Sequence, residues 1–468
     1  MAARSRKILR PFGSLVHPDN ATSTPTEVLT IIDEVLAVHI LDLAIRMGET
    51  MLVSGAPASE VTLTIIRVAG VYGLDPVHVD VTYNSITAAH HQSGAARPLT
   101  LMRVVKGSAP DHDKLQRLQA LSASISSGMP LEEAASEYRR IRRAPFRYRP
   151  MVVVGAQALL AVGVAVMFGG NWLVMVLAFI AAGSAALTQW GMAKARVPYF
   201  FSQIAGAFVL TMVAALAQLL TLTDWAEAEV VRPSIIVASG VVLMLAGLTV
   251  VGAAQDAIDG FALTATGRIL ELTTQTLGVV LGILVGLQTA RVIGLGMEAP
   301  SSALPLGPVP LQFVGAALIA VAVAVYNGAR SRIILVSTAL SIVAWLGYLA
   351  STAVGFDVAT SSGIGAFAGS LVGIVVAYRL HVPSVAITTA AILPLVPGAA
   401  VFRGLLIVVE AGGSPGELME GFGTLVSAGV VGIALAVGAS LGIYLGQPLR
   451  GTLYSLTRPR SRARVGPR

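Results

Sequence analysis

The chain has 468 residues, of which 55% are hydrophobic and only 12% are charged, and its mean hydropathy is +0.76. A soluble protein carries about twice that share of charged residues, so the composition predicts a polytopic membrane protein with one soluble part. The absence of cysteine excludes disulfides, thiolate metal sites and thiol nucleophiles. The net charge of +7 comes from basic residues beside apolar stretches, which fits the positive-inside rule better than nucleic-acid binding.

The first part of the chain is predicted to be soluble. Residues 1–25 are basic and then rich in Thr, Ser and Pro, which predicts a disordered tail without a cleavable signal peptide. The elements expected after it are helices over 27–54, 59–71, 111–126 and 131–142, and strands over 77–87 and 99–105. This order predicts a small cytoplasmic α+β domain over residues 26–150.

Polar residues of this domain form two candidate clusters. Asp42, Arg46 and Glu49 fall on one face of the first helix, where a solvated face is the simpler interpretation. A gating role for them together with Asp80 stays open. His90 and the adjacent His91, with Asp80 and Ser85, leave open a hydrolase or metal site, although their spacing matches no known ligand pattern.

Ten membrane spans are predicted after a basic run at 139–149, which is typical of a juxtamembrane segment attracted to anionic lipid. Their approximate limits are 151–169, 172–191, 200–222, 233–255, 273–293, 307–328, 332–353, 363–380, 384–410 and 421–446. Lys and Arg between the spans fall almost all on the side of that run, and acidic residues fall on the other. Both termini are therefore expected in the cytoplasm, with a basic tail over 451–468 and the spans in the plasma membrane.

The ninth span carries a break in its centre. Its middle reads Leu393-Pro394-Leu395-Val396-Pro397-Gly398, and the two prolines remove backbone donors. Lipid cannot satisfy the freed carbonyls, so such a break must face protein or a water-filled cavity. Arg403 follows inside the same apolar run, and an intramembrane arginine indicates function. A kink that serves packing only, with Arg403 turned outward, is the alternative.

An internal repeat is predicted from small-residue ridges. The fifth and tenth spans both carry glycines at intervals of four, and such ridges allow close helix packing. They are Gly278, Gly282, Gly286, Gly438, Gly442 and Gly446. Five spans in each half, over 151–300 and 301–450, would place the halves in opposite orientations, as in secondary transporters. The ridges permit a homo-oligomer but do not require one.

Charged residues at the end of the fourth span are candidates for transport chemistry. Asp256 and Asp259 precede Arg268, and a charge inside an apolar span is costly. Asp256 could exchange protons or hold a substrate ammonium, and Arg403 could hold a substrate carboxylate if the fold brings the two together. For Asp259 and Arg268, a loop at the membrane face is the simpler alternative.

The sequence contains no enzyme motif in a suitable structural context. No Walker A sequence occurs, and a G-x-S-x-G match at 412–416 lacks the strand and helix that a nucleophile elbow requires. No cofactor and no metal are expected.

Several motifs resemble the threonine/serine exporter family. They are residues 43–56 (LAIRMGETMLVSGA), Glu60-Val61, Val79-Asp80-Val81-Thr82, Asp256-Ala257-Ile258-Asp259-Gly260 with Gly267-Arg268, and Pro394-Leu395-Val396-Pro397-Gly398. The resemblance implies a cytoplasmic N-terminal domain followed by ten spans in two related halves. It also implies export of threonine and serine driven by the proton-motive force. Relatives often carry a proline-glycine motif in the fourth span, where this chain has Ala246-Gly247.

The sequence therefore predicts a secondary transporter that exports threonine and serine, with protons as coupling partner and membrane lipids around it. The path would run through the fourth, fifth, ninth and tenth spans. Two alternatives remain: a hydrolase-like or sensing domain tethered to a membrane anchor, and a channel or exporter for another small metabolite.

Overall fold

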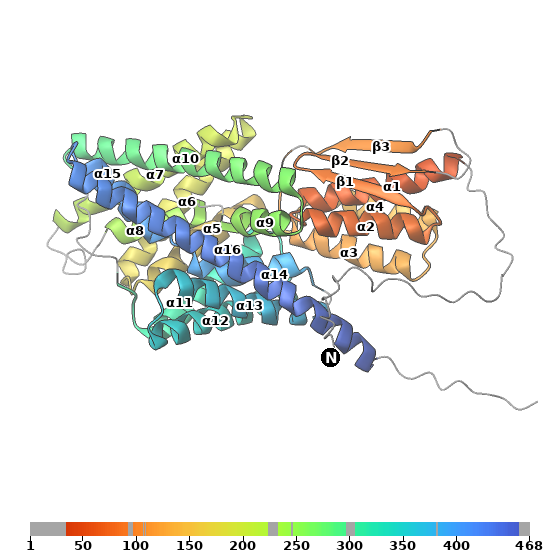
Figure 1. Ribbon diagram of the computed structural model, residues 1–468. Helices are drawn as coiled ribbons and strands as arrows, with labels where there is room; N and C mark the ends of the chain where they lie inside the picture. The colour runs from red at the N-terminus through yellow and green to blue at the C-terminus, as the bar shows by residue number, and fades with distance from the viewer. Residues whose placement is uncertain are drawn as a thin grey trace, which may run out of the picture.

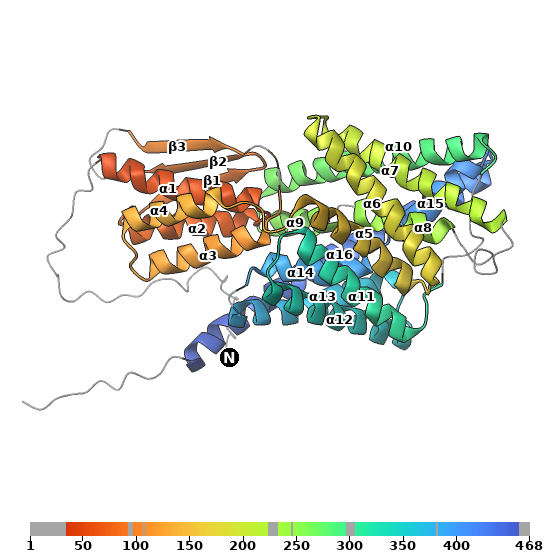
Figure 2. The same ribbon diagram turned by 180° about the vertical axis from the view of Figure 1, so that it is seen from behind.

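The computed structural model describes residues 34–91, 97–105, 107, 109–222, 233–244, 247–295, 305–380 and 382–457. The predicted tail over 1–25 lies outside this range. Figures 1 and 2 show two parts side by side, an α/β unit at the N-terminus and a larger helical part. The N-terminal unit has its own buried apolar cluster, which includes Ile45, Met47, Ile65 and Leu118.

The N-terminal unit is built in three layers. A three-stranded sheet packs on α1 (Glu34–Val53) and α2 (Ala58–Val71), and these two helices pack in turn on α3 (His112–Ser126) and α4 (Leu131–Arg143). Figure 1 shows the sheet along one edge of the unit and α3 along the opposite edge. The predicted α+β composition of this part is therefore present in the structure.

The sheet has three strands, although two were predicted. β1 (Val77–Thr82), β2 (Ser85–His90) and β3 (Leu99–Val104) are antiparallel in the order β1-β2-β3. The predicted strand over 77–87 is in fact a tight hairpin, with Thr82 paired to Ser85 across a two-residue turn. The prediction was wrong because the apolar–polar alternation continues through this turn, which contains neither Gly nor Pro.

The helical part follows directly from α4. Its first elements are α5 (Pro150–Met167), α6 (Trp172–Lys194), α7 (Tyr199–Leu216), η1 (Ala217–Leu222), α8 (Pro233–Met244), α9 (Gly247–Ile258) and α10 (Ala262–Val292). The remaining elements are α11 (Val309–Tyr326), α12 (Ser331–Val354), α13 (Val358–Leu380), α14 (Ser384–Ile392), η2 (Leu393–Leu395), α15 (Gly398–Glu410) and α16 (Pro415–Thr457).

The protein is a polytopic α-helical membrane protein. Among the described residues, eight helices are long and apolar enough to cross a membrane, or nine if α14 and α15 form one bent span. The predicted fourth span falls on α8 and α9, of 12 residues each. Each is shorter than the roughly 20 residues that one straight crossing needs.

Two helices extend beyond their predicted limits. α10 begins at Ala262, so the polar residues before 273 are helical and lie against the N-terminal unit. α16 continues to Thr457, so the first residues of the predicted basic tail are helical as well. Apolar composition marks only the lipid-covered part of a helix, which explains both differences.

The ninth predicted span is broken where the prolines lie. α14 ends at Ile392, the short helix η2 contains Pro394, and α15 begins at Gly398 after Pro397. The two arms are bent by 47°. Gly398 packs directly on Val242 of α8, so a side chain at this position would meet that helix.

The glycine ridges lie at helix contacts within the chain. Gly278, Gly282 and Gly286 of α10 face α7, and Gly438, Gly442 and Gly446 of α16 face α13. An added Cβ at Gly278 would lie 2.9 Å from the carbonyl oxygen of Phe200, and one at Gly442 would lie 2.6 Å from that of Phe367. Backbones therefore approach closely at both ridges, as small residues allow.

The close approach at Gly442 predicts a position-specific cost. We expect Gly442→Ala to destabilise the protein by about 1–3 kcal/mol, because the methyl group would overlap a backbone carbonyl that cannot easily move. Gly432→Ala is the matched control, since nothing lies within 4 Å of a Cβ at that position of the same helix. Thermal unfolding of both variants in detergent tests this, and equal stability of the two would contradict the packing described here.

Candidate functional site

A helical hairpin brings two oppositely charged side chains together. α9 and α10 are joined by a turn at Gly260, whose φ of 88° favours glycine. The amide of Phe261 donates to the carbonyl oxygen of Asp256 across this turn, at 2.8 Å. Because the helices run back alongside each other, Asp256 on α9 faces Arg268 on α10.

Asp256 is fully buried and makes two contacts that suit a carboxylate. Its Oδ2 lies 3.0 Å from Nη1 of Arg268, and its Oδ1 accepts from the backbone N–H of Ala58, also at 3.0 Å. Arg268 in turn donates to the carbonyl oxygen of Ala56 at 3.3 Å. A Cβ on Gly252 would lie 2.6 Å from Nη1 of Arg268, so a larger residue there would require the guanidinium to shift.

Further contacts along α10 join it to the sheet of the N-terminal unit. Thr264 donates to the carbonyl oxygen of Val81 at 2.9 Å, and the Tyr83 hydroxyl donates to Oε2 of Glu271, also at 2.9 Å. The Tyr83 ring packs against Gly267. Burial and the Glu271 carboxylate raise the pKa of Tyr83 to about 12, so its hydroxyl remains a donor at physiological pH.

A second set of contacts joins the N-terminal unit to the turn between α11 and α12. The amide of His112 donates to the carbonyl oxygen of Asn327 at 2.9 Å, and Asp113 pairs with Arg330. Tyr148, between α4 and α5, donates to the carbonyl oxygen of Ala329 at 2.8 Å. The N-terminal unit thus contacts the membrane part both at α9 and α10 and at the α11–α12 turn.

A junction cavity of about 170 Å³ lies between these contacts. Arg268, Glu271 and Gln255 contribute polar groups to it, and Thr388 and Thr389 of α14 line it from the broken span. His112 and Tyr83 line it from the N-terminal unit. It therefore offers hydroxyl, carboxylate and guanidinium groups to a small polar molecule.

A break cavity of about 250 Å³ lies at the interruption of the same span. Pro394, Pro397 and Arg403 line it, together with the stacked rings of Trp345 and Tyr348, whose centroids are 4.9 Å apart. Ser362 and Thr424 add hydroxyl groups. The predicted break therefore does face a cavity.

Arg403 supplies the positive charge of the break cavity. Its Nη2 lies 3.4 Å from Oε1 of Glu420, which is largely exposed, and its buried Nε has no hydrogen-bond partner among the described residues. The N-terminus of α15 at Gly398 adds the positive end of a helix dipole. This combination suits an anionic group such as a carboxylate.

The structure does not bring Asp256 and Arg403 into one site. Asp256 belongs to the junction with the N-terminal unit, whereas Arg403 lines the break cavity. Asp259 is exposed next to the α9–α10 turn. A single pocket that holds a substrate ammonium on Asp256 and its carboxylate on Arg403 is therefore not present in this structure.

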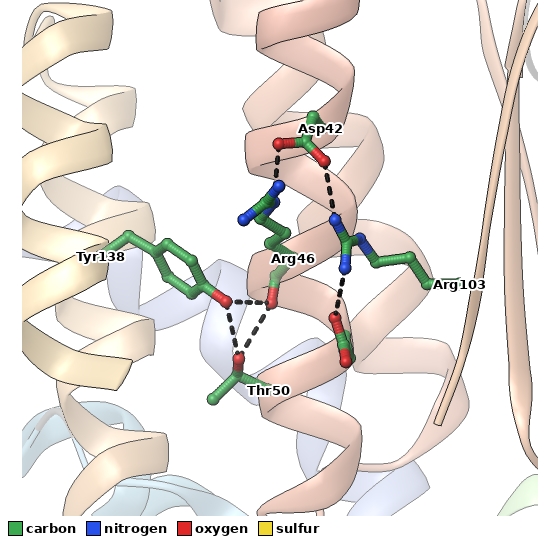
Figure 3. A network of polar contacts seen from close by, with 6 residues as sticks. Asp42, Arg46, Thr50, Arg103 and Tyr138 are labelled. Carbon is green, nitrogen blue, oxygen red and sulfur yellow. Dashed lines mark hydrogen bonds and ion pairs between the residues drawn. The ribbon is translucent and has the colours of Figure 1, made fainter. Parts of the chain in front are cut away.

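The predicted polar cluster of the first helix is an internal network of the N-terminal unit (Figure 3). Asp42 pairs with Arg46 at 2.6 Å and with Arg103 of β3 at 2.9 Å, and Arg103 also contacts Glu49. Burial raises the pKa of Asp42, but hydrogen bonds from Arg46 and Arg103 outweigh it and hold this pKa below its usual value. The network ties α1 to the sheet, and no described contact joins it to the membrane part.

The second candidate cluster does not assemble. Asp80 is exposed and lies opposite Thr87, whereas His90 is buried at the end of β2 with Nδ1 2.9 Å from the carbonyl oxygen of Pro76. Ser85 instead bonds Thr82 across the hairpin turn. Across the part of the chain that the structure describes, no group of three His, Asp or Glu residues could hold a metal ion.

Comparisons with known proteins identify the family of this chain. The family model described as "Putative threonine/serine exporter" matches residues 42–290, and the model "Threonine/Serine exporter, ThrE" matches residues 312–444. The chain belongs to the threonine/serine exporter family. The resemblance seen in the sequence motifs is thus confirmed.

Two proteins named as threonine/serine exporters are similar to most of this chain. A "Probable threonine/serine exporter" of Mycobacterium tuberculosis is 31% identical over 90% of this chain and 78% of its own length. A "Threonine/serine exporter" of Corynebacterium glutamicum is 31% identical over 91% of this chain and 86% of its own length. No solved structure shows a significant match.

The junction predicts a pH dependence that centres on His112. Burial lowers the pKa of His112 to about 4, from 6.5 for a free side chain. In the unfolded chain this histidine becomes protonated below about pH 6.5, whereas in the folded chain it stays neutral down to about pH 4. The free energy of unfolding therefore falls as the pH drops through this window. Between about pH 7 and pH 5 this linkage amounts to about 2 kcal/mol.

We expect His112→Gln to lose about 2 kcal/mol less stability than the wild type over that pH range. His39→Gln is the control, because His39 is exposed on α1. Unfolding followed at both pH values measures the difference. An unchanged pH dependence in His112→Gln would show that this histidine is not neutral in the folded protein.

Proposed function

We propose that this protein exports threonine and serine across the cell membrane as a secondary transporter. Its membership of the exporter family and its multiple apolar helices support this function. The observation that carries the proposal is the broken span, because α14 lines the junction cavity while η2 and α15 line the cavity at the break. Broken helices with binding sites near the membrane centre are typical of secondary transporters.

We propose that the membrane part consists of ten spans in two inverted halves, over 151–300 and 301–450, with α8 and α9 together as the fourth span. Corresponding helices make corresponding contacts: α10 packs on α7 through a glycine ridge, and α16 packs on α13 in the same way. α5 packs on α11, the equivalent pair of first helices. The two family models match residues on either side of the same boundary.

The orientation follows from the distribution of charge. The N-terminal unit, proposed as a domain over 26–150, and the basic residues Lys194, Arg330 and Arg379 lie at the same ends of the spans. The positive-inside rule places that side in the cytoplasm, together with both termini. The junction cavity is then the cytoplasmic one, and the break cavity lies further toward the outside.

The substrate path runs from the junction cavity past the break to the outer surface. Thr388 and Thr389 line the first cavity and Arg403 the second, and buried Ile392 and Leu393 lie between them along the chain. In this path the substrate carboxylate binds Arg403 and the N-terminus of α15, while Ser362 and Thr424 provide partners for a substrate hydroxyl.

Coupling to protons is proposed to act through Asp256. Its ionised form is held by Arg268 and by the N–H of Ala58, so protonation weakens both contacts at once. Loss of these two contacts would loosen the N-terminal unit from α9 and α10. The junction cavity would then open. Proton uptake and access to the cavity are thereby linked.

Liposomes that contain the purified protein and labelled threonine test the transport function. An imposed pH gradient should drive efflux that serine competes for and leucine does not. Efflux that follows only the threonine concentration would indicate a channel. No efflux above that of empty liposomes, with folded protein, would contradict export of this substrate.

Arg403→Gln should weaken transport of threonine roughly tenfold to a hundredfold, because a charge-assisted hydrogen bond to the carboxylate is lost. The cost to folding should be small, since its partner Glu420 is 59% exposed. Arg379→Gln, at the exposed end of α13, removes the same charge outside both cavities and should transport normally. Equal efflux from the two variants would exclude Arg403 from the path.

Asp256→Asn should abolish efflux driven by the pH gradient, while exchange of threonine for threonine continues, because exchange needs no net proton transfer. Asp259→Asn removes an exposed carboxylate from the same turn and should keep both activities. Thermal unfolding identifies any loss that is due to misfolding. Gradient-driven efflux that persists in folded Asp256→Asn protein would refute the coupling role.

A further inference from the structure

A strongly basic cavity lies outside both transport cavities. It is open, measures about 860 Å³, and is formed by α3, α4 and the residue that precedes α12. Five arginines line it: Arg117, Arg139, Arg140, Arg143 and Arg330. Neither the broken span nor the Asp256 pair contributes to it.

The arginines of this cavity outnumber the carboxylates that pair with them. Asp113 pairs with both Arg117 and Arg330, and Glu137 pairs with Arg140. Arg139 and Arg143 have no ion-pair partner among the described residues, and they lie one helical turn apart on the same face of α4. Like charges at this spacing repel each other, so an anion between them would relieve a repulsion that the chain leaves in place.

The geometry of the arginines suits a phosphate group. Guanidinium groups bind phosphate in a bidentate fashion, and several of them around one cavity can share its oxygens. Ser136 lies on the same face of α4 and adds a hydroxyl donor to the lining. The cavity is open to one side, which admits a headgroup that remains attached to a larger molecule.

The position of the cavity favours a lipid over a free anion. α4 is followed after residues 144–149 by α5, and Arg330 immediately precedes α12, so the cavity adjoins the starts of two membrane helices. Phe146 of the connecting segment packs on Gly328, and Tyr148 bonds Ala329, which fixes this segment against the α11–α12 turn. In the orientation proposed above, the headgroup phosphates of the cytoplasmic leaflet would lie beside the starts of these helices.

We infer that this cavity binds the phosphate headgroup of an anionic membrane lipid, held by Arg139 and Arg143 of the N-terminal unit together with Arg330 of the membrane part. The bound headgroup bridges the two parts at the α11–α12 turn. It acts beside the Asp113–Arg330 pair and therefore stabilises the docked position of the N-terminal unit.

Thermal unfolding of the full chain in detergent, with phosphatidylglycerol added to the micelles, tests the inference. Phosphatidylglycerol should raise the midpoint of unfolding of the wild type, while phosphatidylcholine should not. The double variant Arg139→Gln/Arg143→Gln should need at least about tenfold more phosphatidylglycerol for the same shift. Both side chains are exposed on α4, so the variant is expected to fold.

Arg142→Gln is the matched control, because it removes a cation from the same turn of α4 without touching the cavity lining. It should respond to phosphatidylglycerol as the wild type does. An equal response of Arg142→Gln and the double variant would overturn the site. If inorganic phosphate alone raised the midpoint of unfolding as much as phosphatidylglycerol does, the cavity would be a site for free phosphate and the lipid proposal would be wrong. These readouts do not depend on transport, so they remain decisive if the proposed export function fails.

Discussion

The buried carboxylate of Asp256 is the constraint on which the arrangement of the two parts depends. A carboxylate without solvent access is costly unless it is paired and hydrogen-bonded. Here the pairing comes from Arg268 within the membrane part and from a backbone N–H of α2 in the N-terminal unit. Undocking of the N-terminal unit would leave Asp256 with one partner fewer. The contacts of the buried Asp256 carboxylate therefore stabilise the docked position of the N-terminal unit.

The break in the predicted ninth span lies close to this junction. The prolines at 394 and 397 interrupt the helix, so α14 points into the junction cavity while α15 lines the break cavity. Gly398 lets α15 pack on α8, which belongs to the same segment of the chain as Asp256. The contact of α15 with α8 therefore lies on the segment of the chain that precedes the buried ion pair.

Some of this could be predicted from the sequence because the relevant signals are local. Pro394 and Pro397 identify the break, and the spacing of Gly278, Gly282 and Gly286 identifies a close helix contact. The partners could not be predicted, since nothing local links Asp256 to the amide of Ala58, 198 residues away. For the same reason, the sequence could not decide whether the fold brings Asp256 and Arg403 together, and the structure gives each a separate environment.

The errors in the N-terminal unit have a different origin. The strand over 77–87 was predicted as continuous because its alternation persists through Tyr83 and Asn84, and only the pairing of Thr82 with Ser85 reveals a turn. That turn contributes to the junction between the two parts, since it presents Tyr83 to Glu271 of α10. The start of α10 was missed because its first turns mix apolar residues with Thr264 and Arg268, which contact the N-terminal unit.

The N-terminal unit contacts both proposed halves, and this restricts how the transporter can move. It holds α9 and α10 through Asp256, Arg268 and Glu271, and it holds the α11–α12 turn through His112 and Asp113. Alternating access changes the position of one half relative to the other. A rigid unit bound to both halves must release one of the two sets of contacts when they move. The set at α9 and α10 is the one that includes a buried carboxylate, and under the proposed coupling protonation of Asp256 would release this set.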